Sequence, residues 1–307
     1  MALANIRLTA AAILLPLALT GCLNHIAEEG VANALSSQGN SFQSDEDPQL
    51  VEAAIPFGLK LMESLLSDLP NHRGLLLSAC SGFAGYGYAF VLEPAEQSVE
   101  LAHARAGHER ARKLFRRARN YCFRSLDVDH PHLAEALLAG DGARRQAALS
   151  KLTKEDVPAL YWTAVSWSLL IGNSLDDLGL IGQLPAAEAV AERALSLDET
   201  WNEGALYDYF ISLDAARGVN LGGGPAKAKL DFERSQALSG GTRLGPILSY
   251  AEGVLLPAQD RKGFEAALSE VLGYDVGQPK ARANRLANVL AQQRARWLKS
   301  RLDELFL

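Results

Sequence analysis

Apolar residues recur at helical spacing along almost the whole chain after residue 47. Between Val51 and Leu69 they fall on one helical face, at positions 51, 55, 59, 62, 66 and 69. Asp47 and Pro48 precede this face, and a capping aspartate followed by a proline at the first helical position is a typical helix start. We find no convincing alternation of apolar and polar residues that would predict a strand. The pattern therefore predicts an all-α protein whose helical domain spans residues 48–307.

Two helical stretches, residues 75–92 and 157–175, contain no charged residue. Each is long enough to be considered as a membrane span. Both contain serine and glycine, however, and we predict buried helices at the centre of the domain. A second interpretation is that they line a cavity or channel, because binding pockets mix aromatic side chains with a few polar groups. The candidate lining residues are Tyr86, Tyr88, Trp162, Ser166, Trp167 and Asn173.

Four segments share a local pattern of small and aromatic residues. They begin at Ala111, Ala187, Ala228 and Asp260, and in three of them a phenylalanine follows four positions later. Their spacing fits a repeat of roughly 34 to 41 residues if the first interval, from Ala111 to Ala187, contains two repeat units. The pattern is similar to the second helix of a tetratricopeptide repeat, in which small residues let paired helices approach. It predicts a tetratricopeptide-like array of helical hairpins, an α-solenoid-like single domain.

The N-terminal residues resemble an export signal. Arg7 precedes an apolar run over residues 8–19 that is too short to span a membrane. The segment Leu19-Thr20-Gly21-Cys22 resembles the bacterial lipobox, in which the cysteine is acylated and becomes the new N-terminus. We therefore predict a signal peptide over residues 1–21, a lipid anchor at Cys22 and a flexible tether over residues 22–47. An ordinary secretory signal that happens to contain a cysteine is the alternative.

The predicted anchor places the protein in the periplasm. The residue after Cys22 is Leu23, and not the aspartate that is linked with retention in the inner membrane. This favours attachment to the outer membrane.

The charge balance is mildly acidic, with 30 Lys+Arg against 36 Asp+Glu. It argues against a nucleic acid partner, which would need a basic surface. A local basic run over residues 105–124 contains one acid, Glu109. A solvated helix face is one interpretation of this run. The other is a patch that steers an acidic partner, for which Arg116, Arg117 and Arg119 are the candidates.

Cys80 and Cys122 are the only cysteines besides Cys22. In an oxidising compartment they could form a disulfide. Both fall within helical patterns, and free cysteines are often simply buried. The sequence therefore favours two buried thiols and leaves pairing open, because a disulfide needs a close geometry that sequence does not show.

The sequence contains no convincing motif for catalysis. Residues 222–224 with Lys227 lack the Gly-Lys-Ser/Thr order and the preceding strand of a phosphate loop. His130-Pro131-His132 has no third metal ligand at a recognisable spacing. A Gly-x-Ser-x-Gly nucleophile elbow is missing as well. We therefore predict a protein that is not an enzyme, with no catalytic residues, no cofactor and no metal.

Several motifs, taken in order, resemble the T-component (TatT) family of tripartite ATP-independent periplasmic (TRAP) transporters, whose members are lipoproteins. The resemblance covers nearly all of the mature chain. One segment, Tyr207-Asp208-Tyr209, departs from the family where we expect a histidine-containing helix, which leaves its role open. The motifs, besides the lipobox, are residues 44–48, 59–66, 82–86, 115–119, 161–164, 250–252, 284–291 and 294–298.

The resemblance implies a tetratricopeptide-like scaffold that self-associates, as a trimer. It also implies that the scaffold docks a periplasmic solute-binding protein and passes a small organic or hydrophobic ligand through a helical channel in each subunit. The alternative function is that of a structural or assembly lipoprotein of the envelope, whose repeats hold other proteins together without handling a ligand.

Overall fold

The computed structural model describes residues 29–33 and 39–306, and the regular elements in these residues are all helical. The all-α class predicted from the apolar pattern is confirmed. The predicted signal peptide and Cys22 lie outside the described residues. The longer helices are α3 (Pro48–Asp68), α4 (Arg73–Gly87), α6 (Leu101–Asp129), α9 (Val157–Gly172), α11 (Leu184–Leu197), α12 (Ala205–Ala216), α13 (Pro225–Ser239), α15 (Arg261–Gly273) and α16 (Arg285–Ser300).

Shorter elements connect them. The short α-helices are α2 (Gly39–Gln43), α5 (Glu93–Gln97), α7 (Leu133–Leu138), α8 (Gly142–Leu149), α10 (Leu178–Ile181), α14 (Gly245–Tyr250) and α17 (Leu302–Leu305). Two π-helices, η1 (Tyr88–Leu92) and η5 (Ala251–Leu255), extend α4 and α14. The 3₁₀ turns are η2 (Lys154–Asp156), η3 (Trp201–Gly204), η4 (Val219–Leu221) and η6 (Pro279–Asn284).

Helix α3 begins where the sequence predicts. The Asp47 carboxylate accepts hydrogen bonds from the backbone N–H groups of Gln49 at 3.0 Å and Leu50 at 3.1 Å, which would otherwise be unpaired. Pro48 occupies the first turn, where its missing N–H is harmless. The apolar face that follows is buried against α4.

The body of the protein consists of helices packed in pairs: α4 with α6, α9 with α11, α12 with α13, and α14 and η5 with α15. We call α4, α9, α12 and α14 the first helices and their partners the second helices. The four repeated segments of the sequence lie at the second helices, where Ala111, Ala187, Ala228 and Phe264 are fully buried. Small residues at three of these positions bring the helices of a pair into close contact. The tetratricopeptide-like, α-solenoid-like character of the array stays a prediction.

A disulfide joins the first pair of helices. It links Cys80 of α4 to Cys122 of α6, whose Cα atoms are 5.2 Å apart. The sequence favoured two buried free thiols. Both residues are buried as expected, but the prediction that they are free is wrong, because they form a disulfide. The physical reason is the register of the pair, which sets the two cysteines opposite each other within the range that a disulfide needs.

The first uncharged stretch lies within a continuous helical segment, Arg73–Gln97. By length and hydropathy this segment could cross a membrane, but 61% of its most apolar window is buried inside the fold. The second stretch forms most of α9, where Leu160, Trp167 and Leu170 are fully buried. Both therefore pack as central helices, as helices that are apolar all round usually do.

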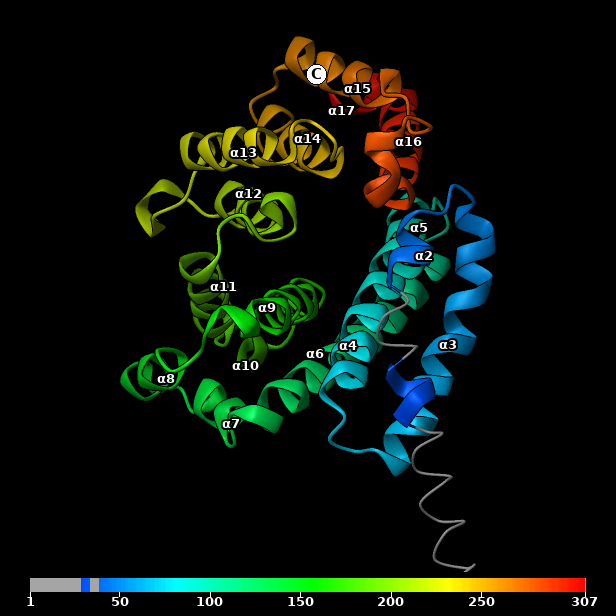
Figure 1. Ribbon diagram of the computed structural model, residues 1–307. Coiled ribbons are helices and arrows are strands. Elements are labelled where there is room, and N and C mark those ends of the chain that lie inside the picture. The colour runs from blue at the N-terminus through cyan, green and yellow to red at the C-terminus, as the bar shows by residue number, and fades with distance from the viewer. Residues whose placement is uncertain (1–28, 34–38, 307) are drawn as a thin grey trace, which may run out of the picture.

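Helix α16 brings the two ends of the helical array together. In Figure 1 the pairs follow one another around a circle until α16 lies beside α5. Its Arg294 guanidinium bonds to Glu252 of η5 at 2.6 Å and to Glu93 of α5 at 3.1 Å, and lies 3.5 Å from Glu96. The array is therefore a closed ring.

Apolar contacts of α16 reinforce this closure. Leu286 and Leu290 pack against the larger core, which extends from α3 to α12. Ala295 and Leu298 belong to the smaller core, which is formed by α14, α15 and α16. One helix thus contributes to both cores.

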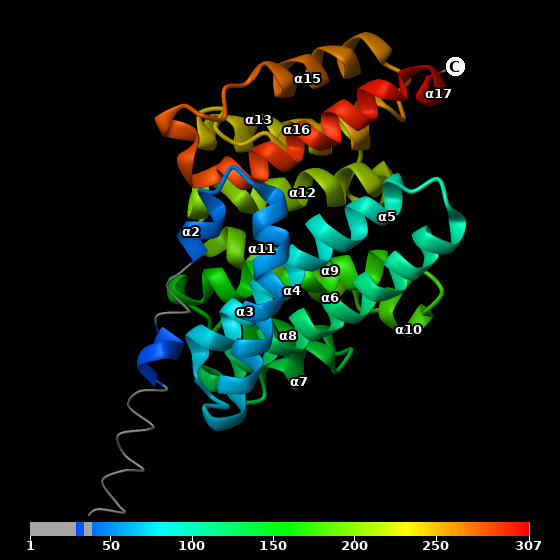
Figure 2. The ribbon, with the colours of Figure 1, turned by 90° about the vertical axis from the view of Figure 1, so that its right-hand side faces the viewer.

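The end of the predicted tether packs against the ring. Helix α2 contacts α16 and η6, and Phe42 lies partly buried against the larger core. Figure 2 shows α2 on one side of the molecule, opposite the connection between α5 and α6. Ala32, further ahead in the chain, is also fully buried in the larger core, so the packed part of the chain begins well ahead of Pro48.

We expect Arg294→Ala to lower the free energy of unfolding by about 1–3 kcal/mol, because it leaves the half-buried carboxylates of Glu93 and Glu252, and the exposed one of Glu96, near one another without a counter-charge. Denaturant unfolding measures this change. The matched control is Arg261→Ala, which removes an exposed arginine from two exposed acids and should change stability by less than about 1 kcal/mol. Equal effects of the two substitutions would contradict the role of Arg294 in closing the ring.

Candidate functional site

Three tyrosines lie on the first helices and their extensions, whose surfaces we call the inner face. Tyr88 of η1 is 47% exposed, and Tyr161 of α9 and Tyr209 of α12 are half-buried. Burial nevertheless raises the pKa of Tyr161 and of Tyr209 to about 12, and that of Tyr88 well above its usual range. The three hydroxyls are therefore neutral across physiological pH.

Aromatic neighbours extend this inner face. The Tyr161 ring lies 5.2 Å from that of Trp162 and 4.8 Å from that of Trp201, centroid to centroid. The Tyr209 hydroxyl is 2.9 Å from that of Ser168. Aromatic surface with a few fixed hydroxyls is the composition of sites that bind organic molecules.

One part of the inner face is charged. Beside Tyr88 lie Glu93, Glu96 and Glu252, which meet at Arg294. Burial and the neighbouring Glu93 charge raise the pKa of Glu96. Burial opposes the charge on Arg294, but its bonds to Glu252 and the other carboxylates outweigh burial and raise its pKa. Both π-helices contribute to this cluster, and such helices are frequent at functional sites.

Four of the six predicted lining residues contact α6. Tyr86 accepts a hydrogen bond from Arg110 at 3.2 Å, and Asn173 lies 3.1 Å from His108. Trp167 is fully buried with its ring 5.0 Å from that of Phe123. Ser166 is also buried, with its hydroxyl 3.9 Å from the sulfur of Cys122.

Tyr88 and Trp162 are the two that contribute to the inner face described above. The structure thus does not gather the six side chains into one cluster. A lining role for them stays a prediction.

The predicted basic patch is engaged within the fold. Arg117 pairs with Glu63 of α3 and lies over the Phe83 ring at 4.7 Å. Arg119 lies over the Phe123 ring at 5.5 Å, and burial lowers its pKa. Arg116 is exposed. Arg117 therefore joins α6 to α3 and α4, whereas Arg119 contacts its own helix, and a partner-binding role for the three candidates stays a prediction.

Tyr161, Tyr209 and Arg294 were not identified from the sequence as candidate site residues. Tyr161 and Ser168 are seven positions apart, so they share one face of α9, and this spacing could have identified that face. Arg294 carries no local signal, because Glu93 lies 201 residues away in the sequence.

The segment Tyr207-Asp208-Tyr209, whose role the sequence left open, ties α12 to three neighbours. Tyr207 donates a hydrogen bond to Glu199 at 2.7 Å. Asp208 pairs with Arg243, just before α14, and accepts a hydrogen bond from Ser235 of α13. Tyr209 reaches α9, as described above. Tyr207, Asp208 and Tyr209 thus contact, in turn, the segment before α12, the region of α13 and α14, and α9.

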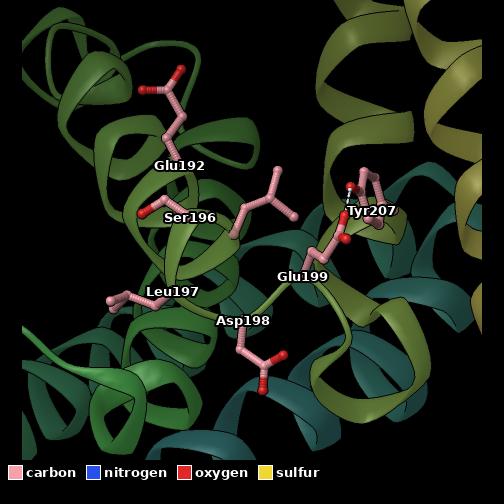
Figure 3. Close-up of a pocket in the computed structure, with 7 residues that line it drawn as sticks. Glu192, Ser196, Leu197, Asp198, Glu199 and Tyr207 are labelled. Carbon is pink, nitrogen blue, oxygen red and sulfur yellow. Dashed lines mark hydrogen bonds between the residues drawn. The ribbon is translucent and has the colours of Figure 1, made fainter.

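A groove of about 550 Å³ lies between the end of α11 and the start of α12 (Figure 3). Two of its three acids are already engaged: Asp198 pairs with Lys154 at 3.0 Å, and Glu199 bonds to Tyr207 and Arg234. The lining residues are Glu192, Leu195, Ser196, Leu197, Asp198, Glu199 and Tyr207. It is a shallow, open surface feature with a single aromatic side chain, so it is a poorer ligand site than the inner face.

A carboxyl pair lies between α12 and α13. Asp214 is fully buried, and Lys227 lies 3.1 Å from its Oδ2 atom. The Oδ2 atom of Asp231 is buried without a hydrogen-bond partner among the described residues. Burial and the neighbouring Asp214 raise the pKa of Asp231 to about 7, although Lys227 opposes the shift. A proton on Asp231 that is shared with Asp214 satisfies this oxygen.

The described residues contain no group of three or more His, Cys, Asp or Glu side chains placed to hold a metal ion. His130 lies instead 3.1 Å from Asp156, and His132 lies 3.6 Å from Glu135. The glycine-rich segment 222–224 connects η4 to α13.

Comparison with known proteins gives two matches. A family model described as "TRAP transporter T-component" matches residues 44–306. An uncharacterized protein of Treponema pallidum (strain Nichols) is 32% identical over 270 residues, which cover 87% of this chain and 82% of the relative.

We expect stability to fall as the pH rises from about 4 to about 7, because the folded state holds a proton on Asp231 that the unfolded chain, with an ordinary aspartate pKa, has already lost. Asp231→Asn cannot ionise, so its stability should change less between pH 5 and pH 8 than that of the wild type. Denaturant unfolding at the two pH values measures the difference. Glu233→Gln on the same helix removes an exposed acid and should keep the wild-type slope. A wild-type slope in Asp231→Asn would contradict the shared proton.

Proposed function

The chain belongs to the TRAP transporter T-component family, and we propose that it acts without catalysis as a periplasmic adaptor of such a transporter. In this proposal it docks the solute-binding protein and lets a small organic ligand pass along the inner face of the ring. The observation that carries the proposal is the inner face itself, where three neutral tyrosine hydroxyls and further aromatic rings lie on first helices enclosed by the closure at Arg294.

The ligand class follows from this surface. Aromatic rings offer apolar area, and neutral hydroxyls offer a few hydrogen bonds. The charged groups near Tyr88 already pair with one another, which leaves little charge for a strongly ionic ligand. The proposed ligand is therefore organic and rather hydrophobic.

The location is part of the proposal. Cys22 carries a lipid that holds the protein at the periplasmic face of the outer membrane. The disulfide between α4 and α6 supports an oxidising compartment such as the periplasm.

Self-association, as a trimer, is also part of the proposal. Leu50 and Phe57 lie seven residues apart on α3 and are 60% and 75% exposed. Exposed apolar side chains on one helix face support burial against another copy.

We expect the dye Nile red, an uncharged organic probe, to bind with increased fluorescence, and Tyr161→Ala or Tyr88→Ala to weaken this binding several-fold. Each substitution removes aromatic surface from the inner face. Tyr207→Ala is the control, because Tyr207 lines the groove between α11 and α12 and not the inner face. Thermal melting verifies that each variant folds. Loss of dye binding in Tyr207→Ala alone would contradict an inner ligand site.

We expect the wild type to fractionate with membranes and to co-purify there with the solute-binding protein of its transporter. Cys22→Ser, which removes the acylated thiol, should be released to the soluble periplasm or remain unprocessed, and the released protein should still bind that partner. Fractionation followed by affinity purification in low salt tests both parts. Unchanged membrane fractionation of Cys22→Ser would refute the lipid anchor. Recovery of envelope-assembly proteins in place of the solute-binding protein would support the scaffold alternative.

A further inference from the structure

The first helices all point in the same direction. Arg73 near the start of α4 lies 3.1 Å from Asp156 just before α9. The Tyr161 and Trp201 rings pair the start of α9 with the start of α12, and Ser168 and Tyr209 pair their middles. Arg243, just before α14, bonds to the backbone oxygen of Asn202, just before α12. The connections that follow the first helices therefore lie at one edge of the ring.

Each of the first three of these connections exposes two large aliphatic side chains. We call this set the aliphatic rim. It contains half of the large hydrophobic side chains that are strongly exposed in the described part of the chain. Its members, with their exposed fractions, are Val99 (96%), Leu101 (63%), Leu175 (70%), Leu178 (82%), Val219 (73%) and Leu221 (74%).

Contacts within the fold relate these connections to one another. Arg217 at the third connection pairs with Glu188, which lies one turn after the second connection. His108 and Arg112, two to three turns into α6, contact Asn173 and Asp176 of the second connection. The second and third connections are therefore neighbours, and the first lies at the start of the helix that packs against the second, on the same edge of the ring.

The fold does not require these side chains. Connections between helices are normally polar, and an exposed leucine or valine contributes no core packing. Single exposed hydrophobic residues are ordinary, but a group of them marks a surface that another molecule covers.

We propose that the aliphatic rim is the surface that docks the solute-binding protein. This inference rests on the proposed function and adds the location of the docking site. The rim is distinct from the basic residues of α6, of which Arg117 and Arg119 are engaged within the fold.

The position of the N-terminal segment argues against the membrane as the occupant. Helix α2 contacts α16 and the preceding η6, at the edge opposite the rim. Figure 2 shows α2 on the left and the α5–α6 connection on the right. The first described helix after the predicted anchor thus packs on the other side of the ring from the rim.

Charge complementarity argues for a protein that differs from this chain. The three connections contain the acids Glu100, Asp176 and Asp177 and a single basic residue, Arg217. Glu188 neutralises Arg217 and Arg112 neutralises Asp176, which leaves the charges of Glu100 and Asp177. An anionic lipid surface repels such an edge. A second copy would set the same acids against one another. A partner with an apolar centre and a basic margin fits the rim.

The test uses the full chain and the purified solute-binding protein of the same transporter. A photoreactive benzophenone side chain is placed at Val99, Leu175 or Leu221 of the rim, and for comparison at Leu50 of α3 or Leu138 of α7, which are also exposed. We expect cross-links to the solute-binding protein from the rim positions only. Mass spectrometry identifies the cross-linked protein.

Charge substitutions provide the second measurement. Leu178→Asp with Leu221→Asp should weaken binding of the solute-binding protein at least tenfold, and Leu50→Asp with Leu138→Asp should change it less than twofold. Melting curves establish that both double variants fold. Cross-links from the rim to another copy of the chain, or loss of binding to anionic vesicles in the rim variant only, would overturn the proposal.

The outcomes separate the docking site from the proposed function. If the wild type binds the solute-binding protein but the rim variant binds it equally well, the docking site is wrong and the adaptor function stands. If the wild type does not bind it under low salt, both are refuted. Rim-only cross-links with tenfold weaker binding of the rim variant support both.

Discussion

The guanidinium of Arg294 holds together parts of the chain that are 201 residues apart. It lies among three carboxylates that would repel one another without it, two of them on α5 and one on η5. Because α16 also contributes to both apolar cores, the ion cluster and the packing fix the same position for this helix. The inner face depends on this closure, since an open array would expose the tyrosines of α9 and α12 to bulk water.

The common direction of the first helices gives the ring two unlike edges. One edge collects the ends of α4, α9 and α12 and exposes aliphatic side chains. The opposite edge holds α2 and the acidic groove between α11 and α12. Parallel stacking of similar pairs therefore separates the surfaces by position: α2 packs near one edge, and the aliphatic connections lie at the other. The same arrangement directs one face of every first helix inward.

Local signals in the sequence were enough to predict the helices. The cap at Asp47, the buried face of α3 and the small residues of the second helices are all determined by neighbours within a few turns. The bond between Cys80 and Cys122 could not be predicted, because it depends on the register of two helices. The direction of each candidate lining residue depends on the same register. Trp167 and Ser166 face α6, whereas Tyr161 on the same helix faces inward, and aromatic content alone does not separate them.

The ring contains two apolar cores, and polar contacts join them at two places. At one, Asp208 pairs with Arg243, and Asn288 bonds to the backbone of Leu244 and Thr242. At the other, Arg294 bonds to α5 and η5. Close-packed apolar cores resist deformation, whereas hydrogen bonds that water can replace contribute only modestly to stability. These polar contacts therefore supplement the apolar contacts of α16, whose Leu286 and Leu290 pack against the larger core and whose Leu298 belongs to the smaller one. The tyrosines of α9 and α12 both pack against the larger core, so their mutual arrangement depends on that core and not on the junction between the two cores.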